Sequence, residues 1–158
     1  PVPVSVIILI TVVLVAWVLL NRTKFGRHLY AVGGNPKAAL ASGINADSVV
    51  VRAFVFNGIL AGIAGIVLMS RINSGQPAAG VAYEFDAITA VVVGGTSLMG
   101  GRGSVISTFF GVLIISVLAA GLAQIGATEP TKRIITGAVI VIAVVLDTYR
   151  SQRASRRG

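Results

Sequence analysis

Long apolar runs separated by short polar gaps dominate the chain. The first run, residues 4–20, contains no charged side chain, and further runs cover 53–70, 104–125 and 134–146. Seventeen residues at about 1.5 Å each extend roughly 26 Å, just enough for the hydrocarbon core of a bilayer. The last run is short unless its helix begins near Pro130, which suits a first helical turn, so we extend it to 131–147. The pattern predicts an all-α fold of membrane-spanning helices.

A fifth apolar segment, residues 86–99, is short and interrupted by Gly94-Gly95. This length suits a broken or re-entrant segment as well as a full crossing. Adjacent glycines beside Thr96 and Ser97 free backbone groups that protein or cavity water must satisfy. Either the break lines a solute pathway or it is a tight packing kink. We therefore expect a polytopic bundle of about five membrane segments, as a single domain over 1–158. The candidate pathway residues are Asn57, Thr89, Gly94, Gly95, Thr96 and Ser97.

Composition supports a membrane protein. Hydrophobic residues make up 55% of the chain and charged residues only 11%, whereas soluble domains carry about 25% charged residues. The net charge of +8 and pI of about 11.2 would suggest nucleic acid in a soluble protein, but here the basic residues occupy the gaps between apolar runs. We therefore expect no nucleic-acid partner.

The basic residues also predict the topology. If residues 21–52 form a cytoplasmic loop, 148–158 form a basic cytoplasmic tail, and the segment 86–99 brings Arg102 to the cytoplasmic side, ten Lys and Arg residues lie inside. Only Arg71, Lys132 and Arg133 then lie outside, as the positive-inside rule requires. This places the N-terminus outside. Since the chain opens at Pro1 directly into a span, we expect it to continue a longer protein.

Catalytic and metal-binding motifs are absent from the sequence. It has no cysteine and a single histidine, His28, which we expect to be a solvated loop residue. The glycine-rich stretch 94–104 lacks the Lys followed by Ser or Thr of a phosphate-binding loop. Asp86 is expected to cap the next helix or, with Glu84, to dock an external partner. We predict no metal, no cofactor and no enzymatic activity.

Small residues at helical spacing mark a packing face in the second span. Gly58, Ala61, Gly62 and Gly65 follow small-xxx-small patterns, which allow helices to approach closely. The face serves packing inside one bundle or, alternatively, a dimer contact. Asn57 is expected to form an interhelical hydrogen bond or to line the solute path.

The loop 21–52 contains signals for a short helix. Asn35 suits an N-cap, Pro36 a first helical position and Gly43 a C-terminal stop. Because so short a helix is unstable in isolation, it must rest on its own bundle or enter a groove on a partner. For the second case we expect Ala38 and Ala39 to face the partner. The candidate coupling residues are Gly34, Asn35, Pro36, Lys37, Ala38, Ala39, Ser42 and Gly43.

These motifs bring a family resemblance. Residues 27–39, with Ser42-Gly43-Ile44, resemble the coupling loop of ribose-type sugar ABC permeases. A second signature joins Gln76-Pro77 to residues 83–88 and 93–104, and a third is Gly121-Leu122. Branched-chain amino-acid permeases share the architecture but are less similar in the loop. Ser107 stands where the family more often has glycine. Ala119-Ala120 stands where asparagine often precedes Gly121, a difference that bears on the solute path.

The resemblance implies a bacterial inner-membrane importer, about twice as long as this chain. Two permease subunits, expected to be identical, would line a path for a sugar through the lipid bilayer. Each would present one coupling helix to a cytoplasmic ATPase, and an extracytoplasmic binding protein would deliver the solute. Alternative solutes are branched-chain amino acids, nucleosides or a signalling furanone. An alternative class is a small structural or channel-like membrane protein, which would have no use for a capped docking helix.

Overall fold

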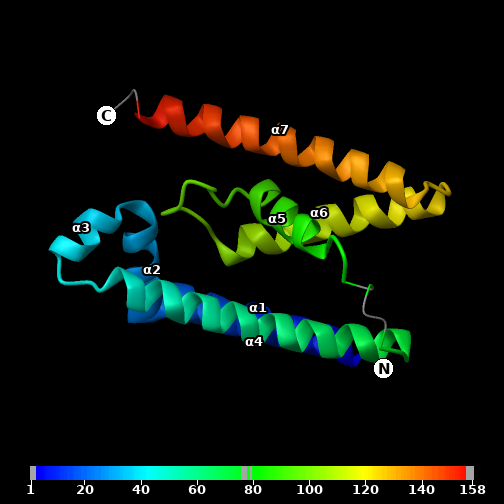
Figure 1. Ribbon diagram of the computed structural model, residues 1–158, viewed down its shortest axis with the longest axis horizontal. Helices are drawn as coiled ribbons and strands as arrows, with labels where there is room; N and C mark the ends of the chain where they lie inside the picture. Colours follow the sequence, from blue (N-terminus) through cyan, green and yellow to red (C-terminus); the bar gives the residue numbers. More distant parts are fainter. Residues whose placement is uncertain (1–2, 76–77, 79, 156–158) are drawn as a thin grey trace. The chain divides into compact units, whose positions relative to one another are not determined.

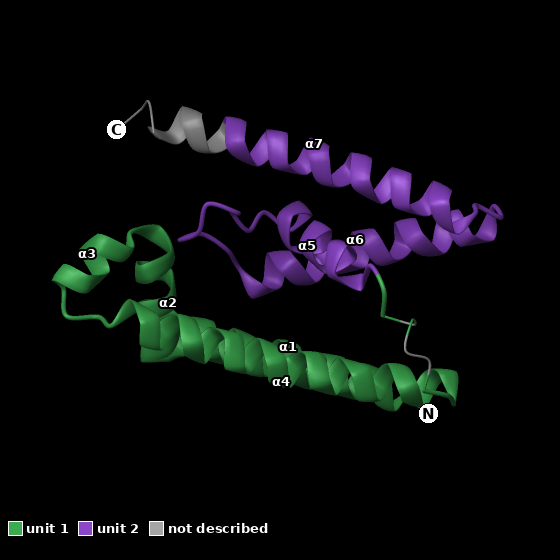
Figure 2. Cartoon of the chain, viewed as in Figure 1, with its two compact units in different colours: residues 1–81 green, residues 82–158 purple. Residues whose placement is uncertain are grey.

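A computed structural model describes residues 3–75, 78 and 80–155, with side chains described as far as Tyr149. Seven α-helices and no strand occur within these residues, which confirms the all-α class (Figure 1). The chain divides into two compact units, residues 1–81 and 82–158, and each is described by itself (Figure 2). Gln76-Pro77, part of the second sequence signature, lies outside the described residues.

Unit 1 consists of two long helices joined by two short ones. Its elements are α1 (Val4–Arg22), α2 (Lys24–Gly34), α3 (Pro36–Ala41) and α4 (Ala46–Ile72). Helix α4 begins seven residues before the expected start at residue 53. Its first turn is amphipathic rather than apolar, and it is capped by Asn45, whose Oδ1 accepts a 3.0 Å hydrogen bond from the Ser48 amide.

Unit 2 is built around its shortest helix. Helix α5 (Tyr83–Val93) contacts both α6 (Val105–Gln124) and α7 (Glu129–Ser155). Helix α6 matches the expected segment to within one residue at each end. Helix α7 begins at Glu129 with Pro130 next, as expected from proline's preference for a first turn. The Lys132 ammonium donates a 2.8 Å hydrogen bond to Glu129 Oε1, which lowers the pKa of that carboxyl.

Three helices in the described part of the chain are long and apolar enough to cross a membrane: α1, α4 and α6. Their large side chains are widely exposed, as for Phe54 on α4 at 73%, a pattern that suits lipid or further helices rather than water. Helix α5 has 11 residues and extends only about 16 Å, too short for a full crossing by itself. The five-segment count stays a prediction for α5 and α7.

The expectation that Asp86 caps a helix is wrong. Helix α5 starts at Tyr83, and Ala82 precedes it with a φ of 75° and no side-chain cap. Glu84 and Asp86 both lie in the first turn, where carboxylates interact favourably with the helix dipole.

Candidate functional site

The short helix α3 has the capping geometry expected from the sequence. Asn35 is extended, at φ −154° and ψ 97°, and its Oδ1 accepts a 3.1 Å hydrogen bond from the Ala38 amide. Pro36 occupies the first turn. Gly43 closes the helix at φ +81°, a left-handed conformation that favours glycine.

Helix α2 was missed by sequence reasoning, which treated residues 24–34 as loop. Its three glycines disfavour a helix in a prediction from sequence. Phe25, Leu29 and Val32 nevertheless recur every three or four residues, and this spacing could have revealed the helix. Thr23 caps this helix, accepting from the Gly26 amide at 3.3 Å and donating to the Leu19 carbonyl at 2.6 Å. One residue therefore links α1 to α2.

Helices α2 and α3 form a helical hairpin, and this hairpin shares a small apolar core with the start of α4. Val32 of α2, Ala39 of α3 and Val49 of α4 are buried together. The partly buried residues packed against them are Phe25, Leu29, Ile44 and Ala46.

This core corrects one expectation about α3. Ala39 is only 4% exposed and faces the chain's own core, so it is unavailable to a partner. The other residues of α3 are all exposed, among them Lys37, Ala38 and Leu40, and Leu40 is 65% exposed. His28 is exposed, as expected, but it lies on helix α2 and not in a loop.

The break at Gly94-Gly95 is present, and glycine is needed at its two positions for different reasons. Helix α5 ends at Val93. A Cβ on Gly94 would lie 2.6 Å from the Ser107 carbonyl oxygen and 2.8 Å from Thr108 Cα, both backbone atoms of α6. Gly95 has open space around it but a φ of +84°. Close packing therefore requires glycine at 94, and backbone conformation favours it at 95.

A second glycine completes this crossing and was not singled out from the sequence. A Cβ on Gly111 of α6 would overlap the carbonyl oxygen of Ala90 and lie 2.8 Å from the Gly94 nitrogen. Helices α5 and α6 thus cross backbone against backbone. An isolated glycine in an apolar helix was the available signal, but its partner is not visible in sequence.

Two of the candidate pathway residues are committed to this packing. Thr89 is fully buried, and its hydroxyl donates a 2.5 Å hydrogen bond to the Phe85 carbonyl of its own helix. Thr96 exchanges a 3.2 Å hydrogen bond with Thr108. Thr89 is therefore shielded within unit 2, whereas Thr96 is half-buried, and a pathway role for either stays a prediction.

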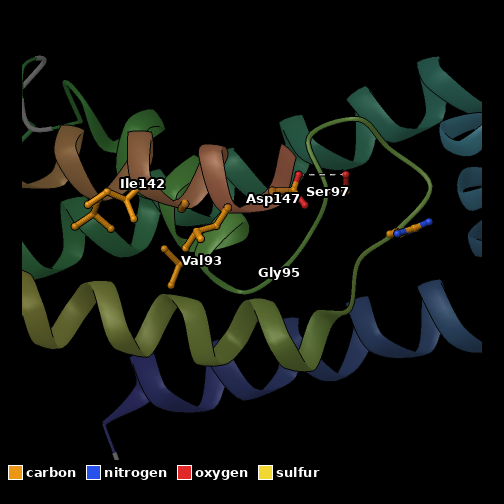
Figure 3. Close-up of a pocket in the computed structure, with 9 residues that line it drawn as sticks. Val93, Gly95, Ser97, Ile142 and Asp147 are labelled. Carbon is orange, nitrogen blue, oxygen red and sulfur yellow. Dashed lines mark hydrogen bonds between the residues drawn. The ribbon is translucent and has the colours of Figure 1, made fainter. Parts of the chain in front are cut away.

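Gly95 and Ser97 line a cavity of about 480 Å³ (Figure 3). The cavity lies between α7 and the glycine-rich loop, residues 94–104, that connects α5 to α6. The Ser97 hydroxyl donates a 3.3 Å hydrogen bond to Asp147 Oδ2, and the Leu98 amide lies 3.4 Å from the same oxygen. Asp147 thereby connects α7 to the loop after α5. Sequence reasoning treated this residue only as the end of a span. The other lining residues are Val93, Arg102, Val139, Ile142, Ala143 and Leu146.

The small-residue face of α4 is open. Asn57, Gly58, Ala61, Gly62 and Gly65 are all exposed, and a Cβ on any of the three glycines would meet no atom within 4 Å. Packing inside one bundle is thus not seen at this face among the described residues. Within the part of the chain that the structure describes, no three His, Cys, Asp or Glu side chains are grouped so that they could hold a metal ion.

Comparison with known proteins agrees with the architecture. Residues 2–144 match the family described as branched-chain amino acid transport system / permease component. The ribose import permease protein RbsC of Bacillus subtilis (strain 168) is 49% identical over 95% of this chain and 47% of its own length. RbsC of Escherichia coli (strain K12) is 44% identical over 94% and 46%, respectively.

A third relative is named for another sugar. The xylose transport system permease protein XylH of Haemophilus influenzae is 40% identical over 96% of this chain and 40% of its own length. The chain therefore spans less than half the length of these relatives. No solved structure matches the chain.

Proposed function

Because this chain belongs to the branched-chain amino acid transport system / permease component family, we propose that it forms part of the membrane-spanning permease of an ATP-driven ABC importer for a ribose-like sugar. The observation that carries the proposal is similarity to ribose and xylose permeases over more than nine-tenths of the chain. The family description favours one second candidate, a branched-chain amino acid.

The chain's part in transport is mechanical rather than catalytic. A partner ATPase in the cytoplasm hydrolyses ATP and docks on the outward face of α3, formed by Lys37, Ala38 and Leu40. Support comes from the capped helix ends and from the apolar core beneath, which holds this face in one orientation. The contribution of Ala39, Ser42 and Gly43 to docking is indirect. Ala39 packs in the core beneath α3, and Ser42 and Gly43 end the helix.

The remaining partners follow from the importer class. An extracytoplasmic binding protein delivers the solute, and a second permease subunit, identical to the first, completes the path. The open small-residue face of α4 is available for helix packing within the permease, and Asn57 beside it is available to the solute. The ten-to-three distribution of basic residues supports an external N-terminus and a cytoplasmic C-terminus in the bacterial inner membrane.

Reconstitution tests this function directly. A full-length permease containing this sequence is placed in proteoliposomes with its ATPase and binding protein, and uptake of radiolabelled ribose and leucine is measured with and without ATP. We expect ATP-dependent uptake of ribose. ATP-dependent uptake of leucine alone would overturn the sugar assignment. Solute flux that is indifferent to ATP would overturn the importer assignment in favour of a channel.

A further inference from the structure

The cavity of unit 2 has an apolar wall and a polar end. Its α7 wall is formed by Val139, Ile142, Ala143, Leu146 and Asp147, which recur every three or four residues and so occupy one helix face. The first four are aliphatic. The polar residues are Ser97, Arg102 and Asp147, and Figure 3 shows the hydrogen bond between Ser97 of the loop and Asp147 of α7.

The polar end coincides with the end of the apolar stretch of α7. Residues 134–146 carry no charge, and Asp147 is the first charged residue after them. With α7 taken as the predicted last membrane segment, Asp147 lies where this helix meets the headgroup layer. From there to Val139 the helix rises about 12 Å, so the cavity wall extends into the hydrocarbon region. Ile142 is 61% exposed and Leu146 51%, so the rest of unit 2 does not cover this part of the wall.

The cavity lining carries two opposite charges, Arg102 and Asp147. No ion pair joins Arg102 or Asp147 to another charged side chain within the described part of the chain. The Asp147 carboxylate receives two long hydrogen bonds, from Ser97 and Leu98, out of about four that a carboxylate accepts. It retains capacity for a cationic donor, and Arg102 can pair with an anion.

We propose that this cavity binds a phospholipid whose zwitterionic headgroup carries a primary ammonium, such as phosphatidylethanolamine. The ammonium donates to Asp147, the phosphate pairs with Arg102, and an acyl chain lies along the aliphatic face of α7. A purely anionic headgroup would bring its charge against Asp147. A choline headgroup has no N–H to donate. A sugar would meet four aliphatic side chains of α7 that offer it no hydrogen bond.

Lipid retention measured by native mass spectrometry tests the site. A full-length permease containing this sequence is delipidated and then given equal amounts of phosphatidylethanolamine, phosphatidylglycerol and phosphatidylcholine with the same acyl chains. We expect phosphatidylethanolamine to be retained about tenfold over either competitor, as one charge-assisted hydrogen bond would give. Equal retention of the three, or preference for phosphatidylglycerol, would overturn the proposal.

Two variants separate the headgroup from the acyl chain. Asp147→Asn keeps an oxygen for Ser97 and Leu98 but loses the charge, and should abolish the preference. Ile142→Trp should fill the cavity and lower retention of all lipids there, whereas Ile114→Trp, at an exposed position of α6 outside the cavity, should not. Equal effects of the two Trp variants would place the lipid elsewhere and refute the site.

Photo-crosslinking keeps the test independent of variant folding. Phosphatidylethanolamine with a photoreactive acyl chain should label the wild-type permease within residues 139–146. Labelling confined to other helices would equally refute the site.

Discussion

Gly111→Ala should destabilise the crossing of α5 and α6 more than any other single added methyl group in unit 2. The new Cβ would overlap the Ala90 carbonyl oxygen and lie 2.8 Å from the Gly94 nitrogen, against an ordinary contact of 3.4–4 Å. Both obstacles are backbone atoms, so no side chain can rotate away. The helices must separate by roughly 1 Å, and overpacking of this kind costs about 3 kcal/mol.

The matched control lies on the same helix. Gly121→Ala also adds one methyl group to α6, but its Cβ meets no atom within 4 Å. There the change should be neutral or stabilising, since alanine favours a helix over glycine by up to about 1 kcal/mol.

Thermal unfolding in detergent, followed by fluorescence-detected size exclusion of a full-length permease, compares the two variants. A loss of about 3 kcal/mol corresponds to a fall of roughly 6–12 °C for a domain of 150–250 residues, and the fall should be smaller for a permease of about twice this chain's length. Gly121→Ala should melt at or above the wild-type temperature. If both variants melt together, the backbone crossing of α5 and α6 does not exist as described.

Three further perturbations probe the remaining features. Replacing Gly95 by alanine or by leucine should lower the free energy of unfolding by the same amount, about 1–2 kcal/mol, because the strain lies in the left-handed backbone and the space around it is open. A much larger loss for leucine would contradict this. Ala38→Glu should reduce solute-stimulated ATP hydrolysis in proteoliposomes while thermal stability stays at wild type, whereas Ala39→Glu should lower stability by burying an unpaired charge. Equal stability of these two variants would contradict the hairpin core. Cysteine placed at Ser74 should react with an impermeant maleimide in intact cells and cysteine at Ser42 should not, and the reverse pattern would overturn the topology.

Local signals were sufficient to predict α3 and α6. Asn35, Pro36 and Gly43 each act on the residues beside them, so their capping roles can be inferred from sequence alone. The apolar run at residues 104–125 is long enough to predict its helix almost to the residue. The break after Val93 was predicted from two adjacent glycines, again a local signal.

What sequence could not supply is which elements meet. The roles of Gly94 and Gly111 depend on a crossing between α5 and α6, and the role of Asp147 depends on a loop fifty residues earlier. The small size of Ala39 suggested a close contact with a partner. In the structure the close contact is with Val32 and Val49 of the same chain. Residue type constrains size and charge, whereas direction comes from tertiary packing.

The connections between α1, α2 and α3 in unit 1 are very short. Only Thr23 separates α1 from α2, and only Asn35 separates α2 from α3. Each joint is fixed by hydrogen bonds between its side chain and neighbouring backbone, and at the first a Cβ on Gly26 would overlap the Leu20 carbonyl oxygen. No long linker therefore separates α3 from α1 along the chain. If the ATPase docks on α3, as proposed above, we expect a displacement of α3 to be transmitted to α1 through these two short joints.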